Sequence, residues 1–268
     1  MSVSGNKFVD DGNTPKVAGT QTLIRGLTVL ECVARGIADV KSISAELRAP
    51  RSTVHRLLAS LVNEGYLHNV PYHGYTLGYK LITLGAKARE QRPLTALAQP
   101  FLEELAAFTG DTVHLGTREG AEVFYLSKVS GGKGLEMRSR IGQHMPIAST
   151  GVGKALMLGS PQAQWRSLYD EAAAMKKADR ERPKMLPWPA YLERMQAYAA
   201  RDWVMDLEEN EIGIRCVGAP VRDVSGEVVA AISVASVIFH MSEERMLELG
   251  PRVHEMASRI SRALGAGM

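Results

Sequence analysis

The sequence has few cysteines, no long apolar run and almost no excess of charge. Its two cysteines, Cys32 and Cys216, lie far apart, so we expect no disulfide framework and a cytoplasmic protein. No apolar run approaches the roughly 20 residues that cross a bilayer, and no charged-then-apolar signal peptide opens the sequence. The sequence contains no internal repeat and no low-complexity tract. A membrane protein, a disulfide scaffold and a repeat array are therefore not expected.

The net charge of +3 is too small to indicate a polyanion partner, but the positive charge is concentrated in one region. From Lys41 to Arg89 there are seven Lys and Arg residues against Glu46 and Glu64, a local net charge of +5. A basic patch on one part of a chain is typical of nucleic-acid-binding domains.

Within the basic region, residues 51–62 carry apolar side chains at the spacing of one helix face. These residues are Val54, Leu57, Leu58, Leu61 and Val62. The opposite face begins with basic and hydrogen-bonding side chains and has no acidic residue. They are Arg51, Ser52, Thr53, His55 and Arg56. This pattern predicts a helix whose polar start could contact DNA.

A second, shorter helix is expected at residues 43–47, and a tight turn, Arg48-Ala49-Pro50, joins the two. Pro50 cannot continue the first helix and biases Ala49 away from helical backbone angles. A short helix, a turn and a helix with a basic start are typical of a helix-turn-helix. An ordinary amphipathic helix pair with a solvated polar face is the alternative interpretation.

The surrounding residues extend this motif to a winged helix-turn-helix domain over residues 20–78. A first helix follows Thr20, with Leu23, Leu27, Leu30 and Ala34 on one face. Two short aromatic-rich runs on either side of residues 71–74 predict a β-hairpin. Residues 1–19 show no periodicity and are expected to form a disordered tail. Residues 79–92 are expected to form a linker helix that stops before Pro93.

Residues 93–268 are expected to form a second domain of the α+β class with an antiparallel sheet. After a helix ending near Gly110, strands are predicted at 112–118, 121–129 and 135–142. Helices follow at 152–158, 161–174 and 189–200, and then strands at 203–207, 214–223 and 227–238. A final helix at 242–264 has glutamates in its first turn, which suits the helix dipole.

A ligand site can be argued in this second domain. Thr150-Gly151-Val152-Gly153 opens a helix, and such a start offers unpaired backbone N–H groups to a carboxylate. A Gly-rich helix cap packed on a sheet is the alternative interpretation. A phosphate-binding P-loop is rejected, because Ala148 and Ala155 stand where it needs Gly and Ser or Thr.

Three side chains in the later strands could complete that site. Asp206 precedes a turn, and a carboxylate accepts hydrogen bonds from ligand hydroxyls. Cys216 and Ser233 are small polar groups in strands otherwise suited to burial. Taken singly, a surface carboxylate, a buried thiol that acts as a small hydrophobe and a locally bonded serine are the ordinary interpretations.

The chain resembles the IclR family of bacterial transcriptional regulators from about Thr20 to the C-terminus. Four stretches carry this resemblance. They read RSTVHRLLASLVNEGYL, YTLGYKLITLG, RIGQHMPIASTGVGKALM and DLEENEIGIRCVGAPVRD. The resemblance implies a GAF-like ligand-binding domain, no cofactor, and a repressor that binds double-stranded operator DNA and controls a catabolic operon. It also implies a small carboxylate effector and self-association as a dimer or tetramer. The sequence around IGQHMP resembles the branch of the family that responds to sugar-derived acids.

The family's pocket positions match Asp206, Cys216 and Ser233 in this sequence, together with the amides near Gly151, from Thr150 to Val152. Met145 and Leu156 are expected to supply apolar walls. Two departures from the family pattern stand out. Ala235 replaces a pocket serine of some members, and Arg48-Ala49 replaces the usual Gly-Leu in the turn. Arg48 is therefore expected to adopt an unfavourable backbone conformation.

Two other classes of function are considered beside the regulator. Cys216 could be the nucleophile of an enzyme with a DNA-binding appendage, with His114 or His144 as its base. No local signature surrounds Cys216, and no set of His, Cys and Asp residues has metal-ligand spacing. The C-terminal domain could instead be an oligomerisation module without a ligand.

Overall fold

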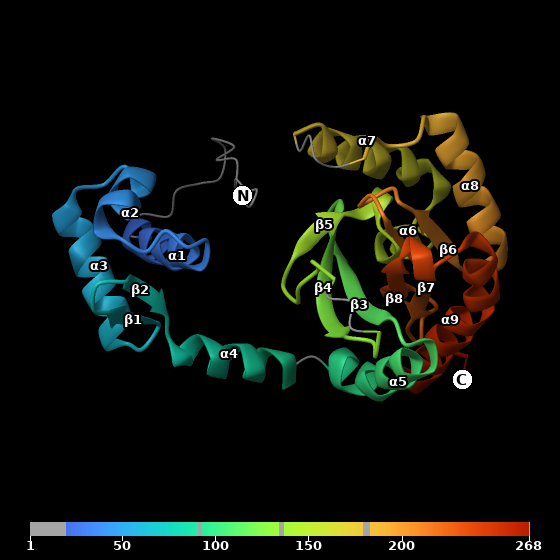
Figure 1. Ribbon diagram of the computed structural model, residues 1–268, viewed down its shortest axis with the longest axis horizontal. Coiled ribbons are helices and arrows are strands. Elements are labelled where there is room, and N and C mark those ends of the chain that lie inside the picture. The colour runs from blue at the N-terminus through green and yellow to red at the C-terminus, as the bar shows by residue number, and fades with distance from the viewer. Residues whose placement is uncertain (1–19, 91–92, 134–136, 179–182, 268) are drawn as a thin grey trace. The chain divides into compact units, whose positions relative to one another are not determined.

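The computed structural model describes residues 20–90, 93–133, 137–178 and 183–267 (Figure 1). The predicted tail at residues 1–19 lies outside the described residues. The chain divides into two compact units between residues 91 and 92, and each is described here by itself. In the described ranges, no helix is both long and apolar enough to cross a membrane.

The N-terminal unit is a winged helix-turn-helix, as the sequence predicts. Its elements are α1 (Gln21–Ala34), α2 (Val40–Leu47), α3 (Arg51–Asn63), β1 (Leu67–Val70), β2 (Gly74–Leu77) and α4 (Tyr79–Glu90). The strands β1 and β2 form an antiparallel hairpin in which Leu67 lies opposite Leu77. The fully buried centre of the unit consists of Val29, Cys32, Ile43, Val54, Leu58 and Leu67.

The turn between α2 and α3 confirms the prediction for Arg48. This residue has φ 47° and ψ 43°, the left-handed region that favours glycine. The Ser44 hydroxyl donates to the Ala49 carbonyl at 2.6 Å and fixes the turn from the helix side. At the other end of α2, the Asp39 carboxylate caps the helix by accepting from the Ser42 amide at 2.9 Å.

Helix α1 buries a different face from the one that its leucines mark. Gly26, Val29, Cys32 and Val33 are buried, whereas Leu23 and Leu27 are exposed. The helix has apolar side chains on two sides, and the small core of this unit covers only one of them.

The C-terminal unit is an α+β fold built on one antiparallel sheet, which confirms the predicted class. Its strands are β3 (Thr112–Glu119), β4 (Glu122–Val129), β5 (His144–Pro146), β6 (Val204–Leu207), β7 (Ile214–Arg222) and β8 (Val228–Val237). They are arranged in the order β5-β4-β3-β8-β7-β6. The helices are α5 (Pro93–Thr109), α6 (Gly151–Met157), α7 (Gln162–Ala178), α8 (Trp188–Arg201) and α9 (Glu243–Ala263), with short 3-10 turns at Ile147–Ser149 and Ile238–His240.

The two faces of this sheet have different partners, because successive side chains of a strand point to opposite faces. Ser236 of β8 donates to the Asp111 carboxylate at 2.7 Å, at the end of α5, and Arg245 of α9 contacts the same carboxylate at 2.5 Å. Ser233, three residues earlier, points to the other face, where the start of α6 lies. Figure 1 shows α5 and α9 side by side on their face of the sheet.

One predicted strand is wrong. Residues 137–142 are irregular, and the strand that pairs with β4 is β5, a few residues later. The Met137 and Ser139 carbonyls accept from the Lys128 ammonium at 2.7 and 2.9 Å. They are therefore turned toward a side chain and not toward a neighbouring strand. Residues 135–136 of the predicted strand lie outside the described residues.

Candidate functional site

The polar face of α3 is free of the core of its own unit. Arg51, Ser52, His55 and Arg56 are exposed and Thr53 is half-buried. Val54 and Leu58, on the opposite side, are completely buried and hold the helix in place. The start of a helix carries a partial positive charge and free N–H groups, which suits phosphate. The arrangement presents two guanidinium groups and three smaller polar side chains on one surface.

In the C-terminal unit, Thr150 begins α6 as the sequence predicts. Its hydroxyl accepts from the Gly153 amide at 2.9 Å. Glycine at 151 lets this helix start approach the sheet closely, because a Cβ there would lie 2.8 Å from the Cys216 Cβ and 3.7 Å from the Ser233 Cβ. All seven residues of α6 are buried. The structure thus brings Gly151, Cys216 and Ser233 together from three segments.

Asp206 joins this group through the register of β6 and β7, in which it lies opposite Cys216. The Cys216 thiol is hydrogen-bonded to the Asp206 carboxylate and faces the Gly151 amide. Asp206 Oδ1 also accepts from the Glu209 amide at 2.8 Å. Val152, the remaining predicted residue, packs its side chain toward Gly116 of β3. All six predicted effector residues therefore lie around the start of α6 and the strands β6 to β8.

Burial sets the protonation of this group. Loss of solvent raises the pKa of Asp206 to about 7, although the nearby Lys154 ammonium opposes the rise. Burial also raises the pKa of the Cys216 thiol well above its ordinary value, and the adjacent Asp206 carboxylate adds to this. At neutral pH the site offers a protonated thiol, a serine hydroxyl, and a carboxyl group that changes its charge within the physiological range.

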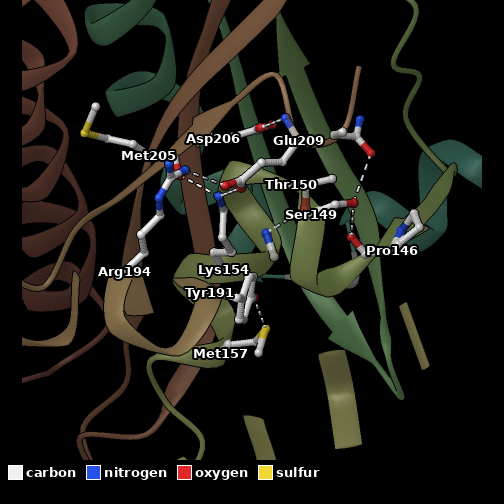
Figure 2. Close-up of polar contacts among 12 residues, drawn as sticks. Pro146, Ser149, Thr150, Lys154, Met157, Tyr191, Arg194, Met205, Asp206 and Glu209 are labelled. Atoms are coloured by element: carbon white, nitrogen blue, oxygen red, sulfur yellow. Dashed lines mark hydrogen bonds and ion pairs between the residues drawn. The ribbon is translucent and has the colours of Figure 1, made fainter. Parts of the chain in front are cut away.

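Three charged residues beside the site were missed by the sequence analysis (Figure 2). Lys154 Nζ donates to the Met205 carbonyl at 2.5 Å and to the Glu209 carboxylate. Arg194 of α8 contacts Glu209 Oε1 at 3.1 Å. Burial would lower the pKa of Lys154, but the Glu209 and Asp206 carboxylates outweigh it and the pKa is raised. A single lysine within the apolar stretch GVGKALM was the available signal, because such a lysine needs a buried partner.

The surroundings of Cys216 do not favour a nucleophile, because a thiolate is the reactive form and burial raises the pKa of this thiol. His114 bonds to the Ser139 hydroxyl at 2.7 Å, and burial lowers its pKa to about 3. His144 of β5 contacts the Glu119 carboxylate of β3 at 2.9 Å. Across the described ranges, no cluster of His, Cys, Asp and Glu could hold a metal ion.

The predicted apolar walls, Met145 and Leu156, belong to the hydrophobic core of the C-terminal unit. Leu156 is one of its buried members, and Met145 packs against it while partly exposed. That Met145 and Leu156 contact the ligand stays a prediction.

Comparison with known proteins agrees with both units. Residues 22–71 match the IclR helix-turn-helix domain, and residues 86–262 match the C-terminal domain of the bacterial transcriptional regulator IclR. The chain is 32% identical to the DNA-binding transcriptional repressor YiaJ of Escherichia coli (strain K12), over 99% of this chain and 94% of that protein. It is 27% identical to the HTH-type transcriptional repressor AllR of the same strain, over 92% and 91% of the two chains.

Solved structures give the same answer. The crystal structure of the Thermotoga maritima IclR superposes with a TM-score of 0.75 at 28% identity, covering 91% of this chain and 98% of that one. These relatives are named as regulators and repressors and not as enzymes, which sets the cysteine-enzyme interpretation aside. The matched models and the full-length relative show that the chain belongs to the IclR family of bacterial transcriptional regulators.

Proposed function

We propose that this regulator represses a catabolic operon and changes its affinity for the operator when a small carboxylate binds its C-terminal unit. YiaJ and AllR are both named as repressors, which supports repression over activation. The observation that carries the effector proposal is the convergence of Gly151, Asp206 and Cys216, which lie far apart in sequence and meet at one helix start.

Each group around the helix start can be given a role. The Gly151 amide faces the Cys216 sulfur, and Thr150 caps the Gly153 amide. We therefore assign the ligand carboxylate to the Val152 amide and the Ser233 hydroxyl. Ionised Asp206 then accepts a hydrogen bond from a ligand hydroxyl, because a carboxylate has no proton to donate. A sugar-derived acid or a related hydroxy acid has both groups.

Helix α3 is assigned to the major groove of the operator. Its exposed Arg51 and Arg56 can contact base edges or phosphates, and Ser52, Thr53 and His55 can add hydrogen bonds. The absence of acidic side chains along Arg51–Asn63 keeps this surface compatible with a polyanion.

Self-association is supported by apolar side chains that the N-terminal unit leaves exposed. Leu23, Ile24 and Leu27 on α1 are each more than half exposed, as are Tyr79 and Ile82 on α4. Neighbouring exposed apolar residues such as Leu23, Ile24 and Leu27 are typical of a helix face that another protein covers. A second copy of the chain, giving a dimer or a dimer of dimers, would place two α3 helices on a palindromic operator.

Ligand can act only through a difference in affinity between two arrangements of the protein. The test therefore measures operator affinity of the full-length protein by fluorescence anisotropy, with the promoter DNA beside its own gene. Gluconate, pyruvate and benzoate serve as probes of the sugar-acid, keto-acid and aromatic-acid classes. One class is expected to weaken operator binding.

Two variants locate the site. Asp206→Ala should weaken binding of the active probe by about 1.5–3 kcal/mol, or roughly ten- to a hundredfold, and Cys216→Leu should block the site by bulk. Both should still bind the operator, whereas the exposed Asp170→Ala serves as the control and should respond like the parent. Unchanged probe affinity in both site variants would place the site elsewhere. No response to any probe would favour a ligand-free oligomerisation module.

A further inference from the structure

Lys154 is a charged side chain in the interior of the C-terminal unit that the proposed ligand contacts do not use. Its side chain is only 1% exposed, although α6 is otherwise built from glycine and apolar residues. A buried ammonium is costly unless it is paired and hydrogen-bonded. Lys154 meets this requirement with two acceptors, the Met205 carbonyl and the Glu209 carboxylate (Figure 2).

Both acceptors flank Asp206 in the chain. Met205 is the residue before it in β6, and the Glu209 amide donates to Asp206 Oδ1 at 2.8 Å. Between them, Glu208 has φ 63°, a left-handed conformation that a non-glycine residue holds only under constraint. Lys154 therefore fastens the strand before Asp206 and the turn after it to the helix that begins at Gly151.

We infer that Lys154 is a positioning residue of the effector site, which holds Asp206 in place as the acceptor for a ligand hydroxyl through Glu209 and the Met205 carbonyl. The inference rests on the proposed function and deepens it. Asp206 and the α6 start come from segments about fifty residues apart, and Lys154 links them directly. Arg194 of α8 contacts the same Glu209 at 3.1 Å, and the Lys176 ammonium of α7 donates to the Glu209 carbonyl.

The charges around Asp206 support this role. Burial raises the pKa of Asp206, the Lys154 ammonium lowers it and the Glu209 carboxylate raises it again. The Glu209 and Asn210 amides also lower the pKa by donating hydrogen bonds. From β7, the Cys216 thiol faces Asp206, and Tyr198 of α8 lies near the Lys154 ammonium, with Nζ 5.7 Å from the ring centroid. Removal of Lys154 should therefore move the titration of Asp206 to higher pH.

A first measurement needs no ligand. The pKa of folded Asp206, about 7, lies above the ordinary 3.8. Asp206 therefore contributes stability that is full below pH 4 and lost as the pH rises through about 7. The difference in thermal midpoint between the parent and Asp206→Asn should follow this course. The same difference measured in a Lys154→Met background should reach its plateau at a higher pH. Full-length protein is used at one fixed concentration, because self-association affects the midpoint.

A second measurement uses gluconate, which carries a carboxylate and hydroxyls, in calorimetric titrations from pH 6 to 9. Affinity of the parent should rise as Asp206 ionises. In Lys154→Met the rise should shift to higher pH, with affinity about tenfold weaker at pH 7.5. Lys177→Met, an exposed lysine of α7, is the matched control and should follow the parent. If Lys154→Met does not fold, Lys154→Met/Glu209→Gln removes both charges of the pair and should shift in the same direction by less.

Two results would overturn the inference. One is an unmoved titration of Asp206 in the ligand-free series. The other is a loss of gluconate affinity that is equal at every pH, which would make Lys154 a purely structural residue. Absence of gluconate binding by the parent would instead count against the sugar-acid proposal, and the ligand-free series would still decide whether Lys154 governs Asp206.

Discussion

The two units of this regulator differ in whether their interiors hold charged side chains. In the N-terminal unit the described charged residues are on the surface, and its buried centre is apolar. The C-terminal unit buries Asp111, Lys154, Lys176, Asp206 and Glu209. A surface that binds a long polyanion needs exposed charge, whereas a site that selects one small molecule needs fixed polar groups away from water. The difference in placement therefore follows the two tasks we assign to the units.

The comparison can be tested most severely by removing the same apolar side chain from each core. Leu58 in α3 and Leu102 in α5 are both completely buried, and each Leu→Ala change should cost about 2–5 kcal/mol. A core of a domain below about 70–80 residues rarely supplies more than about 3–5 kcal/mol. Leu58→Ala should therefore unfold the N-terminal unit, while Leu102→Ala should leave the larger C-terminal unit folded.

The chain provides a clean measurement of this difference. Its three tryptophans, Trp165, Trp188 and Trp203, all belong to the C-terminal unit, so their fluorescence reports that unit alone. Far-ultraviolet circular dichroism reports both units. A fragment beginning at Arg92 should fold on its own. If Leu58→Ala shifts both signals together, or that fragment is unfolded, the two units are not independent domains.

A smaller effect is expected at the DNA surface. Arg56→Ala should weaken operator binding by about 1–3 kcal/mol if the guanidinium contacts a base edge. Lys87→Ala removes one positive charge from exposed Lys87 of α4. This variant should change the affinity for operator DNA and the affinity for unrelated DNA by the same factor. Binding is compared at one salt concentration, since phosphate contacts depend on salt. Full operator affinity in both Arg51→Ala and Arg56→Ala would rule out α3 as the recognition helix.

The smallest expected effect sharpens the comparison within the N-terminal unit. Arg48 holds a left-handed conformation at φ 47°, which costs a non-glycine residue about 1–2 kcal/mol. Arg48→Gly relieves this strain, but glycine also increases the conformational entropy of the unfolded chain, which offsets part of the gain. The free energy of unfolding of this unit should therefore rise by about 0.5–1 kcal/mol. Arg48→Ala keeps the strain and should bring no gain. The urea midpoint followed by circular dichroism measures both variants.

The sequence allowed prediction of features that depend on local pattern. The spacing from Val54 to Val62 predicted α3, and Arg48 was expected to be strained because a side chain stands where the turn favours glycine. The irregular stretch after Met137 was not predictable, because Lys128 draws its carbonyls away from any strand. That contact joins residues nine positions apart through a side chain, and no periodicity marks it.

The candidate effector residues show the same limit. A helix start at Thr150 and the polar residues Asp206, Cys216 and Ser233 could be singled out from the sequence. Their support could not, since Glu209 and Arg194 acquire their role only when β6, α6 and α8 meet. The unusual element, Lys154 within an apolar helix, was visible in the sequence, but its partner was not.

The complete burial of α6 has a consequence for the speed of the response. The groups proposed to hold the ligand, including Asp206 and Ser233, are shielded from water in the described structure. A metabolite reaches them only after a local opening, and such openings occur at a rate set by the protein. In stopped-flow mixing, the observed binding rate should therefore level off as metabolite concentration increases. The regulator would then respond to a sudden increase in metabolite on the timescale of its own opening, whatever concentration the metabolite reaches.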